Sequence, residues 1–161
     1  MYNGNNDPIH QRVIHAALEG QAAKYGNRTF MYFKDKEYSF DEINQTANRV
    51  ASGLQKIGIK KGDKVSIMMD NCPEFLFVWF GVSKLGAVEV PMNTAHKGDL
   101  LTYLLNLSDS NMIVLDSKYL ERVESILKDV PGLKYVVVLN GDKKPLVDRQ
   151  VFGWSEVLNN D

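Results

Sequence analysis

The sequence has one cysteine, Cys72, and no long uninterrupted apolar run, and each scarcity excludes a class of protein. A single thiol cannot form an internal disulfide or a Cys-x-x-Cys metal site, and it fits a reducing compartment. The apolar stretch from Phe75 is interrupted by Lys84 and Glu89, whereas a membrane-spanning helix needs about 20 mostly apolar residues. The N-terminus also lacks the succession of basic, apolar and small residues that marks a secretory signal. We therefore expect a cytoplasmic protein without a transmembrane segment.

Strong charge of either sign is also missing, because the formal net charge is −1 over 161 residues. A nearly neutral chain has no overall attraction to nucleic-acid phosphates, so no nucleic-acid partner is expected. The apolar content of 44% is enough for one ordinary core, and no linker, repeat or low-complexity tract divides the chain. Residues 1–161 are therefore expected to form one folded unit.

Motifs that carry known chemistries are absent as well. No phosphate-binding glycine loop occurs, and the nearest glycine pair, Gly58 and Gly62, precedes a strand pattern and predicts a helix end and a turn. Ser83 lacks the second glycine of a nucleophile elbow, and Ser125 with Lys128 lacks the companion triplets of an S-x-x-K enzyme. The histidines have no metal-binding spacing: His10, His15 and His96. The sequence therefore predicts no catalytic, ATP-binding or metal-binding residues.

What is present is a regular alternation of short β-rich runs with helical patterns. The runs lie at residues 64–69, 87–91, 111–116 and 134–140. Strands that alternate with helices pair in parallel through right-handed crossovers. The expected fold is an α/β domain with a mostly parallel sheet and helices on both faces.

A different unit precedes this series. The sequence TFMYFKDKEYSF predicts two strands around a polar turn at residues 34–36. Ser39 and Glu42 predict a capping box for a helix that begins at Phe40 and ends at Gly58. One apolar stripe along this helix is typical of a surface helix docked on a core.

The stretch DNCPEFLFVWFGVSKLGAVEVP predicts a helix that is apolar on all sides. Pro73 and Glu74 suit its first turn, with Asn71 or Cys72 as the cap, and Gly86 ends it. A helix without a polar face is expected to be buried, with other layers on both sides.

Two segments in order resemble a known family. YSFDEI, at residues 38–43, matches the first core motif of the adenylate-forming enzymes, in which an aromatic residue and Ser or Thr lead into a helix. SKLGAVEVPMN, at residues 83–93, matches their second, Leu-Lys-x-Gly-x-x-x-x-Pro. Within the family, GIKKGDKV and DNCPEFLFVWFG look most like crotonobetaine/carnitine–CoA ligases and fatty-acid–CoA ligases. The resemblance covers residues 10–160, nearly the whole chain.

The resemblance implies the N-terminal part of the family's large domain and an AMP-forming acid–CoA ligase reaction. Such enzymes use ATP, Mg²⁺ and CoA, and they convert a carboxylic acid first to an acyl-adenylate and then to an acyl-CoA. Their phosphate loop, magnesium-binding glutamate and catalytic lysine have no counterpart here, and the terminal VFGWSEVLNND resembles a helix that precedes the phosphate loop. We therefore expect an N-terminal fragment of a larger ligase, inactive alone and with no cofactor bound.

The second motif departs from the family at one position. In several CoA ligases the proline is followed by Asn-x-Arg, and that arginine can reach the phosphates of CoA, whereas PMNTAHK places Ala95 there. Candidate CoA-binding residues are then His96 and Lys97, although a lysine supplies charge without a bidentate fork. The alternative, which we favour, is that residues 94–97 merely lead into the next helix.

Two other interpretations remain open: a stand-alone α/β binding domain, and a fragment of another adenylate-forming branch that acts on aryl or amino acids. If the chain is one half of a two-layer domain, it should expose apolar side chains and self-associate, most simply as a two-fold dimer. The candidates for this exposed surface are Trp79, Phe80, Trp154 and Val157.

Overall fold

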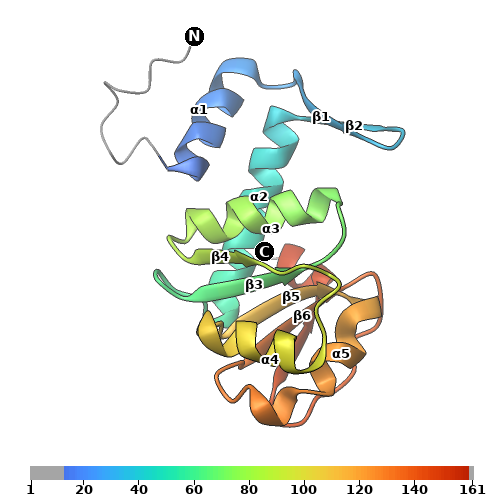
Figure 1. Cartoon of the computed structure of the whole chain (residues 1–161). Coiled ribbons are helices and arrows are strands. Elements are labelled where there is room, and N and C mark those ends of the chain that lie inside the picture. The colour runs from blue at the N-terminus through green and yellow to red at the C-terminus, as the bar shows by residue number, and fades with distance from the viewer. Residues whose placement is uncertain (1–12, 160–161) are drawn as a thin grey trace.

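The computed structural model describes residues 13–159, and its centre is a parallel sheet of five strands (Figure 1). The strands lie side by side in the order β4-β3-β5-β6-β7. Their bounds are β3 Lys64–Met68, β4 Val88–Pro91, β5 Met112–Asp116, β6 Tyr135–Leu139 and β7 Gln150–Gly153. The four predicted β-rich runs are confirmed as the first four of these strands.

The fifth strand, β7, is absent from the sequence prediction, which placed only a helix at the C-terminal end. The helix exists as α6 (Trp154–Leu158), but Gln150–Gly153 pairs in parallel with β6 before it begins. Only Val151 and Phe152 are apolar in this strand, so it carries no β-rich run of its own. The neighbouring strand β6 supplies the pairing that makes it a strand.

Helices cover both faces of the sheet, as expected. In Figure 1, α3 (Pro73–Lys84) lies above the sheet, whereas α4 (Gly98–Leu107) and α5 (Leu120–Glu124) lie below it. Alternate strand residues face opposite sides: Val65 and Ile67 join the core under α3, and Met68 joins the core over α4 and α5. Two short 3₁₀ turns, Ser117–Tyr119 and Leu127–Asp129, flank α5.

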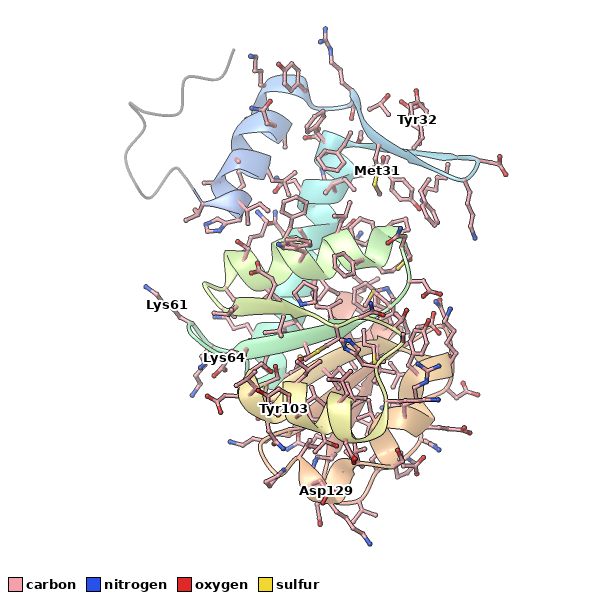
Figure 2. The ribbon with its side chains drawn as sticks, in the orientation of Figure 1. Met31, Tyr32, Lys61, Lys64, Tyr103 and Asp129 are labelled. Carbon is pink, nitrogen blue, oxygen red and sulfur yellow. The ribbon has the colours of Figure 1, made fainter. Side chains whose placement is uncertain are left out.

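The N-terminal unit packs on the α3 side of the sheet. It contains α1 (Ile14–Tyr25), an antiparallel hairpin of β1 (Thr29–Phe33) and β2 (Lys36–Ser39), and α2 (Phe40–Ile57). The predicted capping box is confirmed: Glu42 N donates to Ser39 Oγ at 3.1 Å, and Ser39 N donates to Glu42 Oε2 at 2.7 Å. The hairpin extends beyond the sheet, and Tyr32 projects from it with 73% of its surface exposed (Figure 2).

The expectation that α3 is buried on all sides is only partly right. Phe77, Val78 and Val82 are buried against α2 and the sheet, but Phe75 and Trp79 remain half-exposed. Their rings pack edge to face, with centroids 5.5 Å apart. The helix therefore has one side that the described part of the chain does not fully cover.

Two of the four residues proposed for an exposed apolar surface are wrong, because they are buried. Phe80 is 8% exposed and Val157 is fully buried, and Trp79 and Trp154 are both partly buried. The reason is that α3 and α6 both pack against α2. The large apolar side chains that are exposed on α4 are Leu100, Tyr103 and Leu107, at 51%, 60% and 65%.

Candidate functional site

The order of the strands creates a crevice at the carboxyl edge of the sheet. The connection after β3 runs through α3 to β4, whereas the connection after β5 runs through α5 on the opposite face to β6. Because β3 and β5 are neighbours, the segments that follow them diverge. In open parallel α/β sheets, such a switch point is where ligands bind. The candidate site is therefore built from the segments after β3, β4, β5 and β6.

Asp70, in the segment that follows β3, is the centre of the contacts at this edge. Its carboxylate accepts from Lys118 Nζ, and Oδ1 accepts from the Tyr119 hydroxyl at 2.7 Å. The Lys118 hydrogen bond, then that of Tyr119 and more weakly the Thr94 side chain, lower the pKa of Asp70. The Asp70 hydrogen bond raises the pKa of Lys118 in turn. Both partners of the ion pair are exposed, so its role is to join two loops more than to add stability.

A second group of polar contacts joins the ends of β5 and β6. Asp116 Oδ2 accepts from Asn140 Nδ2 at 2.8 Å, and Ser117 Oγ donates to the carbonyl of Asn140 at 3.0 Å. A Cβ at Gly141 would lie 2.6 Å from that of Ser117, so only glycine permits this approach. The two loops are thereby held together beside Asp70.

Between the hairpin turn and these loops lies a hollow of about 680 Å³. Its walls combine cations, carboxylates and amides, among them Lys34, Lys118, Glu74, Asn71 and Asn140. A neighbouring hollow of about 580 Å³ shares Asp70 and Asn71 and extends toward the segment after β4. The two hollows make the carboxyl edge a continuous polar surface of mixed charge.

The sequence-predicted residues His96 and Lys97 lie on the segment after β4. Their main-chain path is set by Asn93, whose Oδ1 accepts from Ala95 N at 2.8 Å and whose carbonyl accepts from His96 N at 3.0 Å. Lys97 is exposed and occupies the N-cap position of α4 without a side-chain capping bond. Nδ1 of His96 is buried and has no hydrogen-bond partner among the described residues. Their role toward CoA stays a prediction.

The other residues considered from the sequence lie away from this edge. His15 Nδ1 is 3.1 Å from Ser83 Oγ, a contact that ties α1 to α3. Burial raises the pKa of the nearby Glu89 carboxyl, although the charge of His15 opposes the shift. Ser125 Oγ donates to the Arg122 carbonyl at 2.9 Å, which is a local helix-end contact. His10 falls outside the described residues.

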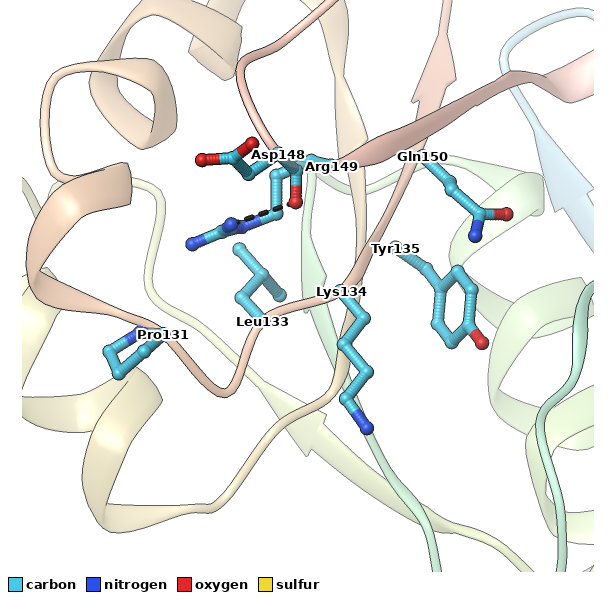
Figure 3. A pocket seen from close by; sticks show the side chains of 7 residues that line it. All are labelled: Pro131, Leu133, Lys134, Tyr135, Asp148, Arg149 and Gln150. Atoms are coloured by element: carbon cyan, nitrogen blue, oxygen red, sulfur yellow. Dashed lines mark hydrogen bonds between the residues drawn. The ribbon is translucent and has the colours of Figure 1, made fainter.

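A further hollow of about 490 Å³ lies at the opposite, amino edge, where β6 and β7 begin (Figure 3). Arg149 dominates it, but the guanidinium is engaged with main-chain carbonyls: Nη2 donates to Leu127 O at 2.8 Å and to Val130 O at 3.2 Å, and Nη1 donates to Asp148 O at 2.8 Å. Arg149 therefore anchors the loop before β6, so its presence in this hollow is explained by a structural role.

Residues 13–159 contain neither a cluster of metal-ligating side chains nor a helix that could cross a membrane. No three His, Cys, Asp or Glu side chains come together there as metal ligands. None of the helices in that range combines the length and apolar character that crossing a bilayer requires.

Sequence reasoning found the segment after β4 but missed the residues that surround it. Asp70, Tyr119 and Arg122 belong to no motif, and the hydrogen bonds that their side chains make join residues 28 to 49 positions apart. The usable signal was the strand pattern itself, because the first polar residues after parallel strands gather at one edge.

Comparisons with known proteins agree with this architecture. The chain matches the family described as AMP-binding enzyme over residues 18–157. It is 32% identical to the crotonobetaine/carnitine–CoA ligase of Salmonella typhimurium strain LT2 over 132 residues, which are 79% of this chain and 26% of the relative. The corresponding ligase of Citrobacter koseri is 34% identical over the same shares. The chain thus spans about a quarter of the length of these relatives.

Solved structures show the same fold. An anthranilate CoA ligase in complex with anthranoyl-AMP superposes with a TM-score of 0.79 and 26% identity, over 90% of this chain and 27% of that one. A long-chain-fatty-acid–CoA ligase of Archaeoglobus fulgidus gives a TM-score of 0.76 at 23% identity, over 91% and 29% of the two chains, and supports the fold alone. With the sequence match over residues 18–157, the chain belongs to the family of AMP-binding enzymes.

Proposed function

We propose that the chain is the N-terminal part of an AMP-forming acid–CoA ligase. The observation that carries the proposal is the match over residues 18–157, together with relatives whose names are those of CoA ligases. In the proposed reaction a carboxylate oxygen attacks the α-phosphorus of ATP, pyrophosphate leaves, and an acyl-adenylate forms. The thiol of CoA then attacks the acyl carbon, loses its proton and releases AMP. The mixed anhydride makes the carboxylate reactive toward a thiolate.

The acid is proposed to be either aliphatic or aromatic, and each class has support. The relatives at 32–34% identity carry the name crotonobetaine/carnitine–CoA ligase, which favours a small aliphatic acid as the substrate. Fatty acids are the second aliphatic class that we propose. The structure with 26% identity is an anthranilate CoA ligase, which favours an aryl acid. Family membership argues against a stand-alone binding domain.

Within this chain, the proposed contribution is to CoA binding. His96 and Lys97 lie on the segment after β4, where the imidazole is partly buried and the ammonium group is exposed. An ammonium group binds phosphate as a point charge. The alternative is that residues 94–97 only connect β4 to α4. In that case, substitution of His96 or Lys97 should not change CoA binding.

We propose that the chain is inactive by itself and that ATP, Mg²⁺ and CoA act only in the longer parent. Acyl-adenylate formation needs groups placed where charge develops on the phosphates. The described residues include no cluster of three metal-ligating side chains.

Acid-dependent exchange of labelled pyrophosphate into ATP tests the proposal. The 161-residue chain should give background exchange with crotonobetaine, carnitine, medium-chain fatty acids and anthranilate. The chain extended through its downstream reading frame should exchange with one of these classes, and that class identifies the acid. Exchange by the 161-residue chain alone would overturn the fragment proposal, and failure of the extended protein with every acid would overturn the ligase proposal.

We further propose a cytoplasmic location, from the single thiol, and concentration-dependent self-association. The surface that we propose for self-association consists of Leu100, Tyr103 and Leu107 on α4, in place of the residues predicted from the sequence. Figure 2 shows Tyr103 on this helix. Residues at spacings of three and four lie on one helix face, so these side chains form a continuous apolar stripe. No nucleic-acid partner is proposed.

A further inference from the structure

The segment from Met92 to Lys97 is held at its two ends and at one point between them. At its start, Met92 N donates to the carbonyl of Ile67 at 2.8 Å, which continues the pairing of β4 with β3. At its end, α4 begins at Gly98. Between them, Arg122 Nη1 donates to the carbonyl of Thr94. This last contact comes from α5, on a different part of the chain.

Arg122 is itself held in place by an aromatic ring. Its guanidinium carbon lies 5.0 Å from the centroid of the Tyr119 ring, within the range of a cation–π contact. The ring of Tyr119 is buried, and its hydroxyl donates to Asp70 Oδ1 at 2.7 Å. The carboxylate, the ring and the guanidinium therefore form a chain of contacts that runs from the end of β3 through α5 to Thr94. In Figure 1 the segment between β4 and α4 descends beside α5, where this chain of contacts ends.

We propose that Tyr119 and Arg122 are positioning residues for residues 92–97, which they hold in one conformation before an anionic ligand of the phosphate class binds. The ligand part of this inference rests on the CoA role proposed above. Ala95 and Lys97 are exposed. The two bonds from Ala95 N and His96 N to Asn93 lie within the segment itself, so the contact at Thr94 O is the one that ties the segment to α5. A loop that is ordered in advance loses less conformational entropy on binding.

Hydrogen exchange of the 161-residue chain tests the positioning role without any ligand. Arg122→Ala should speed amide exchange in residues 92–97 by about tenfold, because hydrogen bonds from a charged donor are among the stronger ones. Tyr119→Phe removes only the hydroxyl and should give a smaller, several-fold increase in the same amides. Exchange in α2 and β3 should stay unchanged in both variants.

Arg149→Ala is the matched control, because Arg149 also donates to main-chain carbonyls but at the opposite edge of the sheet. It should speed exchange near residues 127–130 and leave residues 92–97 unchanged. If Arg122→Ala folds and residues 92–97 exchange as in the parent chain, the positioning role is wrong. If Arg149→Ala loosens residues 92–97 equally, the effect is global and the inference also fails.

Titration with coenzyme A, done on the longer parent protein and its variants because the 161-residue chain alone is expected to bind no cofactor, separates this inference from the proposed function. We expect Lys97→Ala and Arg122→Ala both to weaken binding of coenzyme A, and Arg122→Lys to bind more tightly than Arg122→Ala. All three variants should have a midpoint of thermal unfolding close to that of the unsubstituted protein. If Arg122→Ala binds coenzyme A as tightly as the unsubstituted protein, although its amides in residues 92–97 exchange faster, the proposed link between positioning and ligand binding is wrong. If the longer parent protein binds no coenzyme A, the assignment of His96 and Lys97 fails, and the exchange result alone decides the positioning role.

Discussion

Gly81 of α3 and Val50 of α2 approach so closely that a single methyl group on Gly81 has no room. A Cβ placed there would lie 2.7 Å from Val50 Cγ1 and 3.2 Å from the carbonyl oxygen of Ala47. The neighbour is a fully buried, β-branched side chain on a helix, which cannot turn aside easily. This contact sets the distance between the two helices that cover one face of the sheet.

Gly81→Ala should therefore destabilise the fold, although alanine is the better helix former by about 1 kcal/mol. We expect overpacking to dominate, with a net loss of about 1–2 kcal/mol in the free energy of unfolding, measured by urea denaturation. Gly20→Ala in α1 is the control, because a Cβ at Gly20 would meet no atom within 4 Å, so that variant should be neutral or more stable. A Gly81→Ala protein as stable as the Gly20→Ala protein would contradict the close-packing account.

Phe77→Asp should prevent the chain from accumulating in soluble form. Phe77 is 8% exposed and its ring packs edge to face on Tyr38, with centroids 6.2 Å apart, so the variant would bury an unpaired carboxylate. Leu107→Asp makes a similar change at an exposed position of α4 and should leave expression and thermal stability close to those of the parent chain. A Phe77→Asp protein that is as soluble and as stable as the unsubstituted chain would show that the fold does not depend on burial of this face of α3.

The capping box of α2 should make stability depend on pH. The Ser39 backbone N–H, then its side chain, hold the pKa of Glu42 below its ordinary value of about 4.3. Because the pKa is lowered in the folded state, this contribution is present above the ordinary value and is lost as the pH falls through the folded-state pKa. Glu42→Gln keeps an acceptor but cannot ionise, so its thermal unfolding midpoint should change less between about pH 6 and pH 3.

Ser39→Ala removes the bond to Glu42 N and should cost about 1 kcal/mol. Because the Ser39 side chain also lowers the pKa of Glu42, this cost should be somewhat smaller at low pH, where Glu42 is protonated. The capping account is wrong if Glu42→Gln and the parent chain lose stability in parallel as the pH falls.

Cys72 should react slowly with alkylating reagents. Burial is the main cause that raises the pKa of its thiol to about 11, and the neighbouring Glu74 adds to the shift. Since the thiolate is the reactive form, the fraction available at neutral pH falls well below that of a free cysteine. Mass spectrometry should show slow modification by iodoacetamide in buffer and fast modification in urea. Equal rates in the two solutions would mean that the site at the start of α3 is open.

Self-association through α4 should appear in sedimentation velocity over a range of concentrations. The stripe of Leu100, Tyr103 and Leu107 is exposed in the described structure, and apolar side chains gathered on one face favour contact with a second surface. Leu107→Asp should shift the chain toward the monomer, whereas Val147→Asp, at an exposed site outside this stripe, should not. A parent chain that stays monomeric at high concentration would show that the stripe has no affinity for itself.

The sequence by itself determined the local structure and the family. The capping box at Ser39, the four β-rich runs and the hairpin turn depend on neighbouring residues, so they could be predicted, although the turn is Lys34 and Asp35 and Lys36 already belongs to β2. The two core motifs are also local. Only the tertiary structure decided that residues 150–153 form the strand β7. This strand has only two apolar residues, and it forms because it pairs in parallel with β6. The tertiary structure also decided that Phe80 and Val157 are buried, because α2 packs against both α3 and α6. The contact between Tyr119 and Asp70 depends on strand order as well, since only the placement of β5 beside β3 brings the two loops together.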